Sequence, residues 1–359
     1  MGKMSSVIAG LLLCASLCEA APGAAASVAP PSHAVVFIYH RFGDSRYPST
    51  DTTTEQFKAQ LDWLADNHYE VWPLPKIVRY LKDGKDIPDR VVAISVDDAF
   101  QSFYENAYPL LKVHDWPFTI FVSTDSVDAK QSDFMTWDEL REVAAQGGTL
   151  ANHTADHGHL PFRRKDESDL HWADRVRADI GKGQARLEAE VGKGVNSDPK
   201  LFAYPYGEFT DELVKLVDGL GYVAFGQQAG ALAAPLDPRA LPRFPIDEHY
   251  GDVASFALKA AALPMPFKSV LPWDPQIKAE NPPKLELELD TTVVPAAAVH
   301  CYENGPEMKL GWLDASKTRF TLQADKPMQA GRDRYNCTAY VHGRYYWYSH
   351  MWLLAPSGE

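Results

Sequence analysis

Short apolar runs alternate with amphipathic segments from residue 33 to about residue 262. Runs without polar alternation predict buried strands at 35–39, 91–96, 118–122, 149–151, 201–203, 222–224 and 241–246. Apolar residues at helical spacing predict helices near 54–67, 102–113, 137–145, 168–191, 210–220 and 253–262. Strands of this kind, separated by helices, are typical of a parallel sheet covered on both faces. We therefore predict an α/β fold for 33–262, a closed or nearly closed β/α barrel.

The pattern changes after residue 262. Residues 263–283 contain six prolines, a density that predicts a linker without regular elements. From Lys284 to Leu289 polar and apolar residues alternate, and further strands are predicted at 320–322, 336–341 and 345–353. Residues 284–359 are thus predicted to form a small all-β, sandwich-like domain.

The N-terminus carries the marks of a processing signal. Lys3 precedes an uncharged run over 7–18, and Ala20 offers a small residue at a cleavage position. The run is shorter than the ~20 residues of a membrane span, so we predict a signal peptide over 1–20, a flexible leader over 21–32, and a secreted or periplasmic protein. Lipoprotein anchoring is not expected, because Leu17 stands where lipoprotein signals carry a small residue.

The net charge bears on the possible partners, and the cysteine content bears on disulfide formation. The formal net charge is -13, which argues against nucleic acid as a partner. Removal of the signal peptide leaves Cys301 and Cys337, and two cysteines in one segment of a secreted chain predict a disulfide. The pattern gives no prediction of the oligomeric state.

Polar clusters follow three of the predicted strands. Asp97 and Asp98 follow the strand at 91–96, His153 and His157 follow the strand at 149–151, and a Tyr-Pro-Tyr-Gly segment follows the strand at 201–203. Active sites of β/α barrels are built at the carboxyl ends of the strands, which share one face. We therefore expect the three clusters to converge.

The residue types in these clusters suit a divalent cation. The i, i+4 spacing of His153 and His157 places both imidazoles on one face if the segment is a helical turn. Two imidazoles and one carboxylate match the ligands of Zn²⁺ and similar ions, with positions left for water and substrate. Each cluster also has a plainer interpretation: Asp98 as a helix cap, the histidines as solvated or core residues, and 204–207 as a simple turn.

The clusters resemble the motifs of the NodB-type polysaccharide deacetylases, carbohydrate esterase family 4. Residues 95–100, SVDDAF, resemble the family's T-F-D-D-G motif, and residues 153–160, HTADHGHL, match H-[ST]-x-x-H-x-x-L in full. Residues 202–207, FAYPYG, resemble its R-x-P-Y motif, and 38–41, IYHR, resemble the opening of many members. The resemblance covers about residues 33–262.

The resemblance implies a deacetylase that holds one divalent metal ion and acts on an acetylated glycan. The implied metal ligands are Asp98, His153 and His157, with Zn²⁺ favoured and Co²⁺, Ni²⁺, Mn²⁺ and Fe²⁺ as alternatives. Asp97 is implied as the general base and Arg243 as the arginine that orients it. For the substrate, the resemblance implies a pocket wall at Tyr204, Pro205 and Tyr206, with the backbone N–H of Tyr206 holding the oxyanion.

The sequence departs from the family pattern at several positions. Ala99 stands where the family has Gly, and Ala203 stands where it has Arg, a loss for which Arg243 would compensate. The family's late L-x-H motif, which supplies the general acid, is not evident. We place that role at His249, with His40 and His159 as alternatives, and note that an ester substrate needs a general acid less than an amide does.

Three functions are compatible with these features. The first is a secreted metal-dependent deacetylase of N- or O-acetyl groups on a glycan, such as a chitin fragment, peptidoglycan, poly-N-acetylglucosamine or acetylxylan. The second is a glycan-binding or scaffold protein that keeps the barrel but has lost activity, and the third is an amidohydrolase of small molecules. Aromatic residues in 345–352 also suggest that the C-terminal domain binds carbohydrate, unless they form its core.

Overall fold

The computed structural model describes residues 31–235 and 237–356. The predicted signal peptide over 1–20 and most of the predicted leader lie outside these residues. No helix in the described part of the chain combines the length and the apolar character that a bilayer crossing requires.

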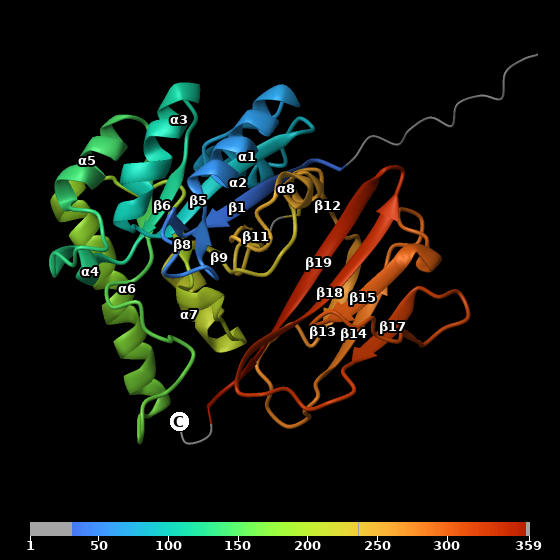
Figure 1. Ribbon diagram of the computed structural model, residues 1–359. Coiled ribbons are helices and arrows are strands. Elements are labelled where there is room, and N and C mark those ends of the chain that lie inside the picture. Colours follow the sequence, from blue (N-terminus) through green and yellow to red (C-terminus); the bar gives the residue numbers. More distant parts are fainter. Residues whose placement is uncertain (1–30, 236, 357–359) are drawn as a thin grey trace, which may run out of the picture. The chain divides into compact units, whose positions relative to one another are not determined.

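A curled parallel sheet forms the centre of the first domain (Figure 1). Its main strands are β1 (His33–Tyr39), β5 (Val91–Asp98), β6 (Thr119–Val122), β7 (Thr149–Asn152), β8 (Leu201–Ala203) and β9 (Val223–Phe225), paired in this order and all parallel. The segment from Leu241 to β11 (Phe244–Pro245) links the two ends of the sheet, because Leu241 pairs with β9 and β11 pairs with β1. The predicted α/β barrel-type fold is thereby confirmed.

Both faces of the sheet are buried, as the apolar strands predict. Val35 and Phe37 of β1 pack in the same apolar cluster as residues of α1 and α3, whereas Val36 joins a cluster with residues of α2. The helices are α1 (Thr54–Asp66), α2 (Leu74–Lys82), α3 (Tyr108–His114), α4 (Thr124–Asp128), α5 (Trp137–Ala145), α6 (Asp169–Val191), α7 (Asp211–Gly219) and α8 (Val253–Ala260). A π-helical turn, η1 (Phe103–Ala107), leads into α3.

Helix α2 was missed by the sequence pattern because prolines surround its start. Pro73 is its N-cap, and Pro75 occupies the first turn, where a missing N–H costs no helical hydrogen bond. Short strands β2 (Arg41–Phe42), β3 (Asp51–Thr52), β4 (Glu70–Val71) and β10 (Leu232–Ala233) complete this domain.

The C-terminal region forms two four-stranded sheets around a separate apolar core. One sheet has the order β12-β19-β18-β15, and the other has the order β13-β14-β17-β16. Their strands are β12 (Leu263–Pro264), β13 (Phe267–Leu271), β14 (Lys284–Leu289), β15 (Val299–Glu303), β16 (Gly311–Trp312), β17 (Arg319–Gln323), β18 (Gly331–Val341) and β19 (Arg344–Leu354). Cys301 and Cys337 lie opposite each other on β15 and β18 and form a disulfide, as the sequence predicts. We call residues 263–356 the β module.

The expectation that 263–283 holds no regular element is wrong. β12 pairs in parallel with β19, and β13 pairs antiparallel with β14. Prolines are tolerated here because Pro264 lies on an edge strand, where its missing N–H breaks no ladder. The Pro-rich segment therefore adds one strand to each sheet of the β module.

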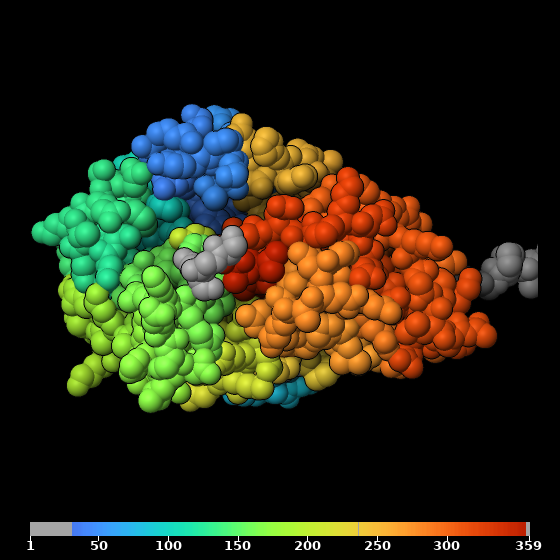
Figure 2. All heavy atoms as spheres, turned by 90° about the horizontal axis from the view of Figure 1, so that it is seen from below, coloured from blue at the N-terminus to red at the C-terminus, as the bar shows by residue number. Residues whose placement is uncertain are grey.

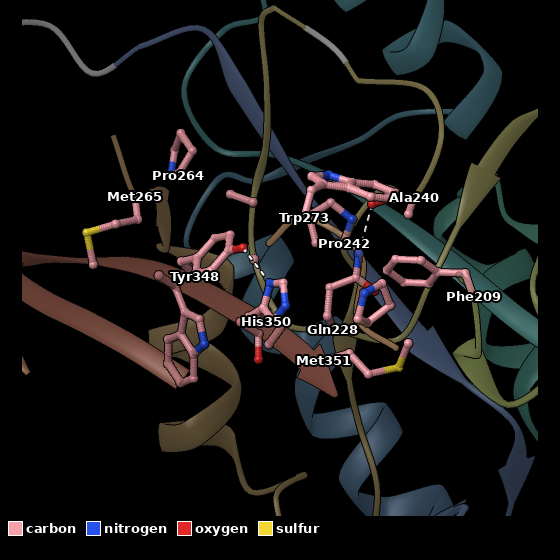
Figure 3. Close-up of a pocket in the computed structure, with 16 residues that line it drawn as sticks. Phe209, Gln228, Ala240, Pro242, Pro264, Met265, Trp273, Tyr348, His350 and Met351 are labelled. Atoms are coloured by element: carbon pink, nitrogen blue, oxygen red, sulfur yellow. Dashed lines mark hydrogen bonds between the residues drawn. The ribbon is translucent and has the colours of Figure 1, made fainter. Parts of the chain in front are cut away.

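Aromatic residues of β19 pack against the first domain or within the β module. The ring of Trp347 lies edge-on to Phe244 with centroids 5.4 Å apart, and Trp352 is fully buried. A cavity of about 160 Å³ lies at the seam, by which we mean the contact between the first domain and the β module. Residues of both line it, among them Phe209, Trp273 and His350 (Figure 3). Most of the aromatics noted in 345–352 thus serve packing.

Candidate active site

The carboxylate of Asp97 is the most buried charged group at the end of β5. Its side chain is inaccessible to solvent, and so is that of Arg243, which donates to its two oxygens at 2.7 and 2.8 Å. Arg243 is itself fixed by Ser95 Oγ and by the carbonyl of Gly226. Burial raises the pKa of Asp97, but the charges of Arg243 and His153 outweigh burial and lower it overall. Asp97 is therefore held ionised.

Asp98 lies opposite the two histidines predicted to accompany it. Its Oδ1 atom is 3.3 Å from Nε2 of His153 and 3.1 Å from Nε2 of His157, and the ligand atoms of all three side chains lie within 4.8 Å of one another. Burial raises the pKa of Asp98, but the two imidazoles outweigh it and hold the pKa well below its usual range. The predicted convergence of the first two clusters is thus present.

The histidine pair lies on an irregular loop and not on the helical turn that we expected. Thr154 and His157 both have positive φ, at 67° and 57°, which a helix does not allow. The Oγ1 of Thr154 accepts from the N–H of His157 at 2.9 Å, and Nδ1 of His153 lies 2.8 Å from the carbonyl of Ala203. The second contact fixes the His153 ring with Nε2 toward Asp98.

Residues of helix α6 hold this loop in place. The Oδ1 atom of Asp179 accepts from the backbone N–H groups of Ala155 and Asp156 at 3.1 and 3.0 Å. Gly183 packs so closely that a Cβ there would lie 2.8 Å from the backbone of Thr154. Neither residue was singled out from the sequence, because α6 shows only a charged amphipathic pattern and no motif.

The turn after β8 contributes one side chain to the site, not three. Tyr204 is inaccessible and donates its hydroxyl to the carbonyl of Arg239, and Pro205 is also buried. Because both side chains are buried, the structure gives no support to the expectation that they line a sugar pocket. Tyr206, in the 3-10 turn η2 (Pro205–Gly207), has φ 59° and lies edge-on to His157 with ring centroids 4.6 Å apart. It alone of the three borders the histidine pair.

The three histidines considered for the general acid occupy different places. His249 is exposed, and within the described residues it makes no hydrogen bond or ion pair with the Asp98 cluster, so the structure gives no support to our preference for it. His40 directly follows β1 and is close enough to Asp98 and Asp97 that their charges oppose the burial that lowers its pKa. His159 stacks on Tyr206 at 4.1 Å and contacts Glu208 at 2.7 Å.

Ala99, the first departure from the family pattern, shows why glycine is usual there. Its φ is 63°, in the left-handed region that glycine enters without penalty. The second departure, at Ala203, is offset by Arg243, whose two hydrogen bonds to Asp97 supply a contact of the kind expected from the missing arginine.

Comparison with protein families assigns the class of this domain. Residues 84–225 match the family model described as polysaccharide deacetylase. This segment contains Asp97, Asp98 and the histidine pair, and it forms the greater part of the curled sheet. The chain therefore contains a polysaccharide deacetylase domain of the NodB type.

Two curated relatives carry the same name, poly-β-1,6-N-acetyl-D-glucosamine N-deacetylase. The protein from Escherichia coli K12 is 26% identical over 233 residues, which is 56% of this chain and 34% of that protein. The protein from Staphylococcus aureus MRSA252 is 29% identical over 218 residues, which is 59% of this chain and 73% of that protein. The match thus spans only about a third of the E. coli relative's length.

Solved structures share the fold of the first domain. The Streptococcus pyogenes deacetylase PplD, in complex with acetate, aligns with a TM-score of 0.56 at 20% identity, over 64% of this chain and 99% of its own. IcaB from Ammonifex degensii aligns with a TM-score of 0.54 at 24% identity, over 65% of this chain and 99% of its own.

Proposed function

We propose that this protein is a metal-dependent deacetylase that removes acetyl groups from an N-acetylated glycan. The observation that carries the proposal is the grouping of Asp98, His153 and His157 beside an ionised, arginine-held Asp97. These are the parts that metal-assisted amide hydrolysis requires: a three-ligand cation site with positions left for substrate, and a base next to it.

The residues present fit a divalent cation. Asp98 Oδ1 is buried and makes no hydrogen bond within the described residues, although two imidazole nitrogens lie within 3.3 Å of it. A cation held by Asp98, His153 and His157 would satisfy this oxygen, and it would supply Lewis-acid polarisation of the acetyl carbonyl and acidify the attacking water from a pKa of 15.7 towards about 7. Zn²⁺ suits two imidazoles and a carboxylate best.

Asp97 serves as the general base in this proposal. Because its pKa is lowered, it is ionised at neutral pH and ready to accept the proton of the water that attacks the acetyl carbonyl. Arg243 keeps both of its oxygens oriented while the proton moves. The backbone N–H of Tyr206 is proposed to stabilise the developing oxyanion, a contribution of roughly 3–4 kcal/mol for a well-aimed donor.

His40 is the residue that we now propose as general acid. It lies at the carboxyl end of β1, which pairs directly with β5, and the Asp97 and Asp98 charges act on it. Burial lowers the pKa of His40 overall, against the pull of the two carboxylates, and in its protonated form the imidazole would donate to the leaving amine nitrogen. His249 is not proposed again, because it is exposed and its described contacts do not reach the cluster.

The names of the relatives suggest the substrate. Both act, by name, on poly-β-1,6-N-acetyl-D-glucosamine, and we propose a glycan of this N-acetylglucosamine class for this protein. We also propose that it acts outside the cytoplasm, because the Cys301–Cys337 disulfide is typical of an oxidising compartment. The retained base, arginine and ligand set argue against the scaffold alternative.

Acetate release from soluble oligosaccharides tests the proposal. The full-length protein would be assayed on β-1,6- and β-1,4-linked N-acetylglucosamine oligomers and on acetylated xylan, before and after chelation and with Zn²⁺ restored. We expect release from an N-acetylglucosamine oligomer that chelation abolishes and Zn²⁺ restores, and none from Asp98→Asn. Release that survives both chelation and Asp98→Asn would refute the metal site, and glycan binding without release would favour the scaffold alternative.

A further inference from the structure

An arginine of the β module contacts the turn that borders the metal-ligand histidines. Arg332 lies on β18, and its Nη1 donates a hydrogen bond to the backbone carbonyl of Tyr206. Its guanidinium carbon also lies 5.8 Å from the centroid of the Tyr206 ring. The two residues are separated by 126 positions in the chain, so the contact joins the β module to the candidate active site.

The turn that Arg332 contacts is itself tightly packed. The Tyr206 ring is stacked on His159, at 4.1 Å and 10°, and lies edge-on to His157. Its left-handed backbone is a conformation that non-glycine residues adopt only when their surroundings enforce it. A hydrogen bond to the carbonyl of Tyr206 fixes the Tyr206–Gly207 peptide plane, which directly follows the N–H of Tyr206 in the same tight turn.

A buried carboxylate links the same arginine to the next residues of the turn. The Glu208 side chain is only 4% exposed, with one oxygen 2.7 Å from Nδ1 of His159 and the other 3.7 Å from Nε of Arg332. A buried carboxylate needs charged or hydrogen-bonding partners to offset its desolvation. Among the carboxylates in the described part of the chain, only that of Glu208 lies within ion-pair distance of Arg332. This arginine therefore pairs with a residue of the deacetylase domain and not with one of its own module.

Other contacts across the seam also hold the sheet that contains β18 against the deacetylase domain. β19 is the neighbour of β18, and Arg344 of β19 donates to the carbonyl of Ala261 and to Asp89, while Tyr348 of β19 forms a bridge with Gly230. In the space-filling view the orange and red surface of the β module lies against the green and yellow surface of the deacetylase domain (Figure 2). Arg332 is thus presented to the turn by a sheet that is joined to the deacetylase domain.

We propose that Arg332 is a positioning residue for deacetylation, which makes the β module part of the catalytic apparatus and not only an appendage for holding polymer. It acts by fixing the Tyr206 turn, whose backbone N–H is the donor proposed above for the oxyanion. This inference rests on the proposed function. It follows that the β module contributes to turnover of short, soluble substrates that are too small to reach a separate binding surface.

Three variants of the full-length protein test this role. Arg332→Gln removes the charge, Arg332→Lys keeps one charged donor for the Tyr206 carbonyl, and Arg319→Gln is a matched control that breaks an arginine–glutamate contact elsewhere in the β module. On a soluble N-acetylglucosamine oligomer, we expect Arg332→Gln to lower kcat roughly 10- to 100-fold, the effect of a small misplacement of catalytic groups. KM, the melting temperature and bound metal should change little, Arg332→Lys should recover part of kcat, and Arg319→Gln should match the wild type.

A second readout keeps this inference separable from the proposed activity. Hydrogen–deuterium exchange of the peptide that contains residues 204–208 should be faster in Arg332→Gln than in the wild type or Arg319→Gln, whatever substrate the protein uses. Equal kcat in Arg332→Gln and Arg319→Gln, or equal exchange of this peptide, would overturn the positioning role. A wild type that deacetylates nothing, with faster exchange in Arg332→Gln, would refute the proposed function but not the contact.

Discussion

Arg243 and Asp97 are separated by 146 positions in the chain, yet they form a two-pronged ion pair at the base of the candidate site, and neither side chain is accessible to solvent. The pair connects the segment that links β9 and β1 to the carboxyl end of β5. The geometry of the barrel and the orientation of the base therefore depend on the same contact.

Replacement of this arginine by lysine should impair catalysis. Lys keeps the charge but donates from a single point, so it cannot hold both oxygens of Asp97. We expect Arg243→Lys to lower kcat/KM about 100-fold, the scale expected for a misplaced catalytic group. Arg239→Lys is the matched control, because Arg239 forms a similar pair with Asp237 at the surface, where such pairs contribute about 0–1 kcal/mol. Equal acetate release by both variants would contradict the orienting role.

Substitution of the candidate histidines should separate His40 from His249. Since His40 lies near the Asp97 and Asp98 charges, His40→Ala should lower kcat by roughly 10²- to 10⁴-fold, the range for loss of a general acid. His249→Ala should retain wild-type turnover. The reverse pattern of acetate release would restore the original assignment from the sequence.

Two glycines of α6 should respond in opposite ways to alanine. At Gly181 an added Cβ meets nothing within 4 Å, so Gly181→Ala should raise the free energy of unfolding by about 0.5–1 kcal/mol through helix propensity. At Gly183 the Cβ would clash with the backbone of Thr154 and displace the loop that carries His153 and His157. Gly183→Ala should therefore lower both stability and Zn²⁺ affinity, measured by urea unfolding and by calorimetric titration. Unchanged metal affinity would show that the loop tolerates the added carbon.

The seam between the two parts should weaken in acid because of His350. Burial lowers the pKa of this histidine to about 3, whereas the unfolded chain titrates near 6.5, so its contribution to stability is complete above pH 6.5 and is lost as the pH falls towards 3. Between pH 6.5 and 4.5 the loss should be about 2–3 kcal/mol, at about 1.4 kcal/mol per pH unit.

Urea unfolding at these two pH values measures the loss. His350→Asn should lose less stability than the wild type over this interval, because the variant has no imidazole to protonate. His300→Asn is the control, since His300 is half-exposed in the same module. If the wild type and His350→Asn lose the same free energy of unfolding between the two pH values, protonation of His350 is not the cause of the loss.

The sequence was sufficient to predict the chemistry at the ends of the strands. The two aspartates and the two histidines could be grouped in advance because parallel strands bring their carboxyl ends to one edge, and the family resemblance then selected Asp98, His153 and His157 as the ligand set. The same reasoning could not tell which side chains of the next turn face the site. Tyr204 and Tyr206 are two residues apart, and only the left-handed backbone at 206 turns one of them toward His157.

Residues that support the site from other elements were beyond the reach of the sequence pattern. Asp179 and Gly183 lie on a long charged helix, where nothing local marks a carboxylate that binds a loop or a glycine that makes room for one. Arg332 lies on a strand of a different sheet. The strands at 263–264 and 267–271 were missed for a related reason, since proline excludes a central strand but not an edge.

β12 follows α8 by only a few residues and is the outer strand of a sheet in the β module. A protease cut or a gene truncation at residue 262 would leave β12 with β19, but it would remove the bridge between Gly230 and Tyr348 from the edge of β19 on one fragment and uncover the ring of Phe244 on the other. Bare edges of this kind recruit other chains. The two halves are for this reason expected to be inherited, expressed and degraded as a single piece, and fragments that end at this point should aggregate.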